Sequence, residues 1–131
     1  MRTWPAVAAL GGWTVFLWVT RVKNALADDA MSNGGKAVAL VTSGLFLGGA
    51  VGVVVAHARG ARHAPRAAAV FAVVSIGYWL VRAATILGRD RSVGFKTVHT
   101  VLALVTVGLG GWVLRSVLGR SSERGLARTP A

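Results

Sequence analysis

The sequence contains no cysteine, and it has only 4 acidic residues in 131. Without cysteine the chain can form neither a disulfide framework nor a thiolate metal site, and thiol chemistry is excluded. Asp28, Asp29 and Asp90 lie in predicted loops, and Glu123 lies near the C-terminus. No apolar stretch therefore carries a carboxylate that could move a proton or bind a cation, which argues against a small proton-coupled transporter of the usual kind.

Long uncharged stretches account for most of the chain. They cover residues 3–20, 37–56, 67–81 and 97–114. About 20 apolar residues in a helix cross the hydrocarbon core, so the third run needs Arg82 inside the membrane edge and continuation through Leu87, which a snorkelling guanidinium allows. The polar interruptions are Gly, Ser and Thr, and none of the runs has the periodic polar stripe that a soluble four-helix bundle would show. We predict an all-α integral membrane protein with four spans.

Two short patterns recur in the same order. ALVTSGL at residues 39–45 returns as ALVTVGL at 103–109, and Trp18-x-x-Arg21 returns as Trp79-x-x-Arg82. Ordered recurrence of two landmarks favours duplication of a two-helix unit over chance matches among common membrane residues. We therefore expect a four-helix bundle of two tandem parallel hairpins. The predicted divisions are a first hairpin over 1–56, a basic connecting loop over 57–66, a second hairpin over 67–114 and a basic, disordered tail over 115–131.

The charge distribution predicts the orientation. Parallel repeats place both termini and the central loop on one side, which holds eight positive residues; the other side holds seven, or five when Arg21 and Arg82 are set aside as snorkelling side chains. The positive-inside rule then places both termini in the cytoplasm of a multi-pass protein of the cell membrane. The basic loop and tail would face anionic lipid headgroups. Nucleic-acid binding is not expected, although the net charge is +11, because the positive charges are divided between two membrane faces.

A glycine pattern follows the first heptad. Gly44, Gly48, Gly52 and Ala56 recur every fourth residue, so they lie on one face of a helix. Such a smooth face lets a second helix approach closely, which is a main source of helix association in lipid, although glycine is also common in membrane helices. In the second copy Gly108 matches Gly44, but Trp112 stands where Gly48 would be and blocks the groove.

Residues with chemical functions are few. Trp18, Arg21, Trp79 and Arg82 are interpreted as interfacial anchors, because Trp favours the membrane interface and Arg reaches headgroup phosphates; the alternative is that the two arginines line a site between the copies. His57 and His63 lie on the side of the termini and His99 lies near the opposite face, a separation that does not suit a haem or metal site. No nucleophile has a nearby acid or histidine. We therefore expect no cofactor and no enzymatic activity.

The stretch from Trp18 to Asn24, followed by a short loop and a second apolar helix, resembles the small two-helix membrane proteins of actinobacteria, a family whose function is not known. The resemblance implies a first helix ending in Trp-x-x-x-x-Lys-Asn and a second helix that opens with an aromatic residue and Val-His. The first copy matches at Trp18, Lys23 and Asn24, and the second copy matches at Phe95, Val98 and His99. Because each copy keeps one half of the pattern, the resemblance implies that any polar site of Asn24 and His99 would be assembled between the copies.

These patterns favour a structural or accessory subunit that packs through its glycine face against itself, as a homo-oligomer, or against a larger membrane complex. The alternative function is a small oligomeric channel or transporter, and an enzyme is the least favoured class.

Overall fold

The computed structural model describes residues 2–128 and 130, and in this part of the chain it contains four α-helices and no strand. The helices are α1 (Trp4–Ala27), α2 (Asn33–Ala58), α3 (Ala64–Leu87) and α4 (Val93–Ala127). The shortest have 24 residues, which corresponds to about 36 Å at the usual helical rise. All four are long and apolar enough to cross a membrane, which confirms the all-helical prediction and the number of long apolar helices.

The local sequence explains where the helices begin. Both α1 and α3 have a proline in their first turn, where the missing N–H and the restricted backbone are tolerated. Both α2 and α4 follow a serine whose hydroxyl accepts a hydrogen bond from a backbone N–H of the first turn: Ser32 from Gly35 at 3.1 Å and Ser92 from Phe95 at 3.2 Å. The first helix of each hairpin thus begins with a proline in its first turn, and the second helix of each hairpin begins with a serine cap.

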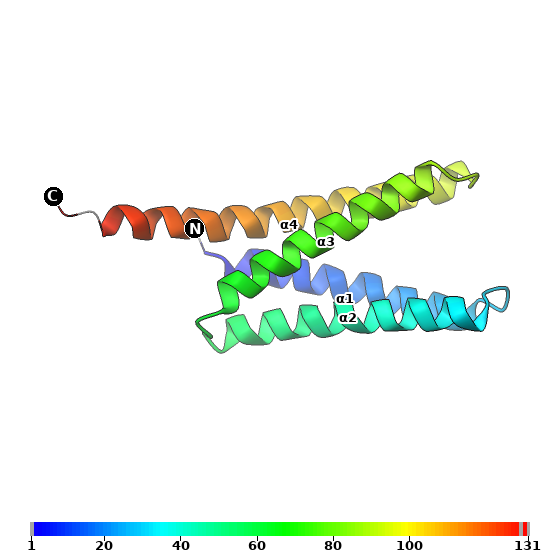
Figure 1. Ribbon diagram of the computed structural model, residues 1–131, viewed down its shortest axis with the longest axis horizontal. Coiled ribbons are helices and arrows are strands. Elements are labelled where there is room, and N and C mark those ends of the chain that lie inside the picture. Colours follow the sequence, from blue (N-terminus) through cyan, green and yellow to red (C-terminus); the bar gives the residue numbers. More distant parts are fainter. Residues whose placement is uncertain (1, 129, 131) are drawn as a thin grey trace.

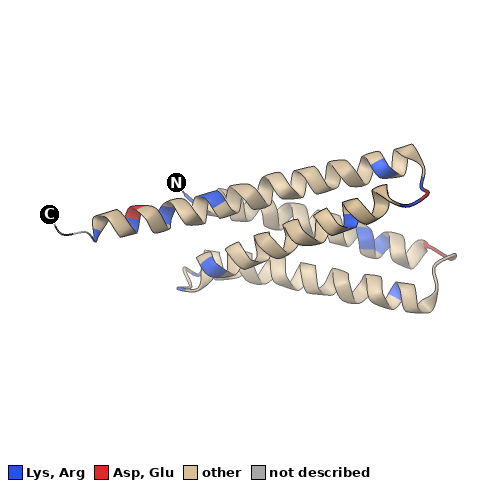
Figure 2. Ribbon diagram, turned by 45° about the horizontal axis from the view of Figure 1, so that its top comes forward, with Lys and Arg blue, Asp and Glu red and all other residues tan. Residues whose placement is uncertain are grey.

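The four helices form two antiparallel hairpins that pack against each other (Figure 1). The most extensive contacts join α1 to α2 and α3 to α4, and smaller contacts between α1 and α4 and between α2 and α3 connect the hairpins. The N-terminus and the α2–α3 turn lie toward one end of the bundle, and the α1–α2 and α3–α4 turns lie toward the other. Charged residues occur near these ends and along the projecting part of α4, with uncharged helix between them (Figure 2).

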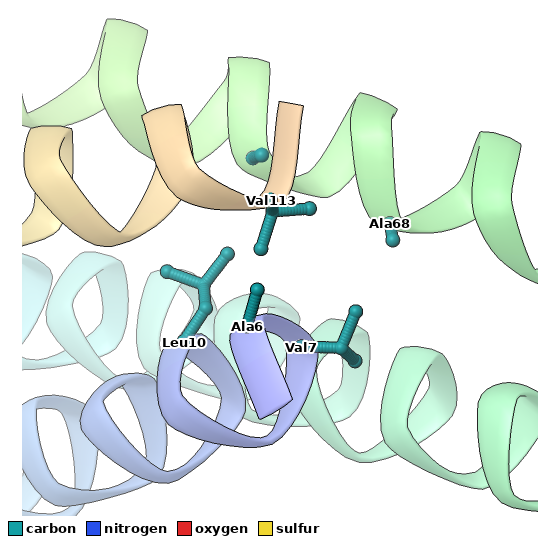
Figure 3. Packing of buried hydrophobic residues seen from close by; sticks show 6 residues of the cluster. Ala6, Val7, Leu10, Ala68 and Val113 are labelled. Carbon is teal, nitrogen blue, oxygen red and sulfur yellow. The ribbon is translucent and has the colours of Figure 1, made fainter. Parts of the chain in front are cut away.

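Small and branched apolar side chains from three helices fill the half of the core nearer the termini. Ala6, Val7 and Leu10 of α1 meet Ala68 and Ala72 of α3 and Val113 of α4, and Figure 3 shows these side chains converging between the helices. All are almost completely inaccessible to solvent, so the alanines allow the helix backbones to come close while valine and leucine fill the remaining space.

Three glycines mark the closest approaches between helices. A Cβ atom placed on Gly11 would lie 2.6 Å from Cγ2 of Val54, one on Gly49 would lie 2.9 Å from Cε2 of Phe71, and one on Gly110 would lie 2.8 Å from Cγ1 of Ile76. These separations are too short for carbon atoms in van der Waals contact. At these positions the absence of a side chain is therefore what makes room for a neighbouring helix.

Two of the predicted boundaries are wrong. The central loop is shorter than 57–66, because α2 continues through Ala58 and α3 already begins at Ala64. The tail predicted to be disordered from residue 115 is helical as far as Ala127. No proline interrupts the chain between residues 115 and 127, and the buried Ser116 and half-buried Val117 still contact the rest of the bundle, so nothing ends α4 where its apolar run ends.

Gly11 and Gly12 provide a matched pair for testing this packing. Replacing Gly11 by leucine should lower the stability of the bundle by about 1–3 kcal/mol, because the stiff β-branched Val54 blocks the new side chain. Replacing Gly12 by leucine should leave the stability of the bundle unchanged, since no atom beyond the nearby backbone of α1 lies within 4 Å of its Cβ position. Thermal unfolding in detergent measures both variants, and equal midpoints would contradict the packing described for Gly11.

Candidate functional site

The glycine face of α2 lies on the outside of the bundle. Gly44, Gly48 and Gly52 are exposed and Ala56 is half-buried. Apart from the nearby backbone of α2 itself, no atom lies within 4 Å of the Cβ position of any of the three glycines. Within one chain, therefore, no helix occupies this face. The glycines that do admit a neighbour are Gly11, Gly49 and Gly110, which the glycine spacing did not single out.

The borders of this glycine face are apolar and prominent. Val41, Leu45, Val51 and Val55 are all exposed along α2, and no charged residue occurs between Lys36 and Arg59. The corresponding face of α4 is also outside, because Gly108 is exposed and Trp112 is 41% exposed. Trp112 therefore does not fill the α2 groove of its own chain, and each hairpin presents an outer face, one smooth and one bulky.

The two tryptophans interpreted as interfacial anchors lie inside the bundle. Trp18 is 3% exposed and Trp79 is 8% exposed, and their ring centroids are 6.4 Å apart. Trp18 also stacks on Phe46 with a centroid separation of 4.5 Å and an interplanar angle of 8°. Burial among aromatic rings does not suit a residue whose indole should rest among headgroups, and the structure instead gives both tryptophans a packing role in the second half of the core.

Arg21 and Arg82 are half-buried near the end of the bundle opposite the termini. Neither arginine forms an ion pair with a carboxylate of the described residues. No contact among these residues therefore supports the alternative, in which the arginines form a site bridged to Asp28, Asp29 or Asp90. Their role as anchors that reach headgroup phosphates stays a prediction.

Asn24 and His99 are not brought together by any contact within the described part of the chain. Asn24 is exposed near the end of α1. The ring of His99 packs on Phe95 with 4.1 Å between centroids, and its Nδ1 lies 2.9 Å from the carbonyl oxygen of the same residue, one turn back along α4. The hydrogen bond and the ring contact of His99 are thus both local to α4, and they provide no support for the composite polar site.

One polar contact between the hairpins escaped the sequence analysis. Nε1 of Trp13 on α1 donates a hydrogen bond to Oγ1 of Thr106 on α4 at 3.0 Å, and that hydroxyl in turn donates to the carbonyl oxygen of Leu102 at 2.9 Å. Thr106 belongs to the repeated heptad, where threonine is an ordinary membrane-helix residue, so only the pairing of α1 with α4 shows that it has a partner. Hydrogen bonds of this kind between membrane helices stabilise by about 0.6–2 kcal/mol.

The described residues contain no group of three or more His, Asp or Glu side chains placed to hold a metal ion. Comparisons of the chain with models of protein families, with curated proteins and with solved structures find no match. The resemblance to the actinobacterial two-helix proteins therefore stays a prediction.

Fluorescence quenching by brominated phosphatidylcholine should distinguish buried from lipid-facing tryptophans. Because Trp112 is exposed along α4, replacing it by phenylalanine should remove emission that the brominated acyl chains quench. Replacing the buried Trp79 by phenylalanine should instead remove emission that is protected from quenching. If Trp79 contributes as much quenchable emission as Trp112, its burial among the aromatic side chains is contradicted.

Proposed function

We propose that the chain is a multi-pass protein of the cell membrane that serves as a structural or accessory subunit and associates with a second copy of itself through the glycine face of α2. Four long apolar helices support the membrane location, together with the position of charged residues near the two ends of the bundle (Figure 2). The weak excess of positive charge on the side of the termini favours a cytoplasmic location for both of them.

The observation that carries this proposal is the contrast between two sets of glycines. Gly11, Gly49 and Gly110 each admit a neighbouring side chain of the same bundle, whereas Gly44, Gly48 and Gly52 admit none. In a helix interior each glycine costs about 1 kcal/mol relative to alanine, and here the cost is not offset by packing within the chain. A helix of another molecule would offset it.

The α2 helix of a second copy is a better partner for this face than a helix that runs antiparallel to α2. Two copies of one chain inserted in the same orientation present their α2 helices in parallel, as the right-handed small-xxx-small pairing requires. The exposed valines beside the glycines have one strongly preferred rotamer in a helix, so little side-chain freedom is lost on contact. A twofold axis along the membrane normal would give each copy the same contacts.

A channel between copies is less well supported. Such a conduit needs polar side chains along the face that the copies share. The exposed residues of α2 between Val38 and Val55 are all glycine, valine or leucine.

The duplication is supported by the pattern of burial as well as by the repeated landmarks. The buried residues of α3 are Ala64, Ala68, Ala72, Ser75, Trp79 and Ile86, and each lies 61 positions after a buried residue, in order Thr3, Val7, Gly11, Thr14, Trp18 and Ala25. This is the offset that relates Trp18 to Trp79. We infer that the two hairpins descend from one unit, and a superposition of the hairpins in a different register would oppose this inference.

Replacing Gly48 by leucine should weaken self-association by about tenfold or more, equivalent to about 1.4 kcal/mol, because the new side chain occupies the space that the second α2 helix needs. Crosslinking in vesicles, or energy transfer between labelled copies, measures the association at several ratios of protein to lipid.

Gly77 is a matched control, since it is an exposed glycine in the middle of α3 with no atom within 4 Å of its Cβ position and no glycine one turn away on either side. Gly77→Leu should associate as the unmodified chain does. Association that survives Gly48→Leu, or that falls equally in both variants, would remove the support for this face. Association that requires a different protein would point to the larger complex.

A further inference from the structure

A hollow of ≈ 560 Å³ opens at the end of the bundle where the N-terminus lies. It is lined by Arg2 and Trp4 at the start of α1, by His57 and Ala58 at the end of α2, and by Arg120 of α4. These residues come from three separate parts of the chain, so the hollow exists only in the folded bundle. In the sequence analysis Arg2 and Arg120 were counted only as members of a dispersed basic surface.

The lining is positively charged, and its cations lack an intramolecular counter-charge. Two guanidinium groups and one imidazole line the hollow, and no acidic residue does. Neither Arg2 nor Arg120 forms an ion pair with a carboxylate of the described residues. Glu123, the acid closest in sequence to Arg120, is exposed and is not part of the lining. Such a concave cluster of one sign attracts an anion more strongly than the same charges on a flat surface.

His57 adds a buried polar atom without a partner. Its Nδ1 lies 3.3 Å from the carbonyl oxygen of Val53, whereas its Nε2 is buried and has no hydrogen-bond partner among the described residues. Because Nε2 is inaccessible to solvent, the imidazole ring has to turn toward the hollow before this nitrogen can contact a bound anion. A buried polar atom without a partner is unfavourable, and such an anion would satisfy it.

Trp4 indicates the depth of the hollow in a membrane. Its side chain is 47% exposed at the first position of α1, where the apolar part of the helix begins. Indole rings favour the boundary between hydrocarbon and headgroups, which is also the level of lipid phosphates. Unlike Trp18 and Trp79, this tryptophan is available to the surroundings at the end of a span.

We propose that this hollow binds one phosphate group, presented by an anionic phospholipid headgroup at the membrane surface. Arginine is suited to phosphate because its planar group donates two parallel hydrogen bonds to adjacent oxygens. Arg2, just before α1, and Arg120 of α4 would hold the phosphate, His57 of α2 would donate to it once its ring has turned, and Trp4 would pack beside the glycerol backbone. The bound lipid would thus join α1, α2 and α4 at the end where the hairpins meet. This site rests on the proposed membrane location but is independent of the self-association of α2.

Dispersed attraction and a defined site make different predictions for single charge removals. General attraction to an anionic surface acts about equally on every basic residue close to it. Under that mechanism Arg120→Gln and Arg124→Gln should have equal effects, since both lie on α4 and both remove one positive charge. A site predicts that only Arg120→Gln matters, because Arg124 is exposed and does not line the hollow.

The test is native mass spectrometry of the full chain in nonionic detergent with added phosphatidylglycerol or phosphatidylcholine. We expect one phosphatidylglycerol to remain on the unmodified chain and on Arg124→Gln, and Arg120→Gln and Arg2→Gln each to lower its retention by about tenfold. Phosphatidylcholine, whose headgroup has no net charge, should be retained weakly by all of them. Gly48→Leu should retain phosphatidylglycerol normally, so failure of the self-association proposal would be distinguishable from failure of this one.

A second arm identifies the source of the phosphate. If inorganic phosphate without lipid raises the unfolding temperature of the unmodified chain and of Arg124→Gln but not of Arg120→Gln, while phosphatidylglycerol is not retained, the phosphate site stands and its ligand is free phosphate. Equal losses in Arg120→Gln and Arg124→Gln would overturn the proposal in favour of dispersed attraction. Absence of binding by both probes would overturn it as well.

Discussion

The close approach of helices at glycine is the constraint on which the rest of this structure depends. The interior contains no ion pairs among the described residues, and the Trp13–Thr106 hydrogen bond joins side chains of two different helices there. The helices must therefore be held together largely by the close packing of their complementary surfaces. Val54, Phe71 and Ile76 enter the spaces left at Gly11, Gly49 and Gly110, and each contact brings two helices together.

The same constraint separates the inside of the bundle from its outer face. Adjacent residues in a helix point about 100° apart, so the two members of a glycine pair cannot serve the same interface. Gly11, Gly49 and Gly110 face neighbouring helices, whereas Gly12, Gly48 and Gly111 have no atom within 4 Å of their Cβ positions. The open face of α2 is thus a consequence of the way in which the hairpins pack, and it is the reason that we infer an external partner.

The two ends of the bundle differ in chemistry although the hairpins are similar. At the end with the α1–α2 and α3–α4 turns, no hydrogen bond joins His99 to Asn24 among the described residues, and Trp18 and Trp79 are buried in the aromatic core. At the end with the N-terminus, Arg2 just before α1, Arg120 of α4 and His57 of α2 line one hollow. The function that we infer therefore involves two surfaces, an apolar face along α2 and a basic hollow where α1, α2 and α4 meet.

The sequence by itself determined the helical class and the four long apolar segments, because the length of an apolar run is a local property of the chain. Only the tertiary structure decided which face of each helix is covered. Spacing placed Gly44, Gly48 and Gly52 on one face but could not show that this face points outward, nor that Trp18 points inward. It could not join Arg2, His57 and Arg120 either, because their proximity depends on how three helices pack rather than on any local pattern.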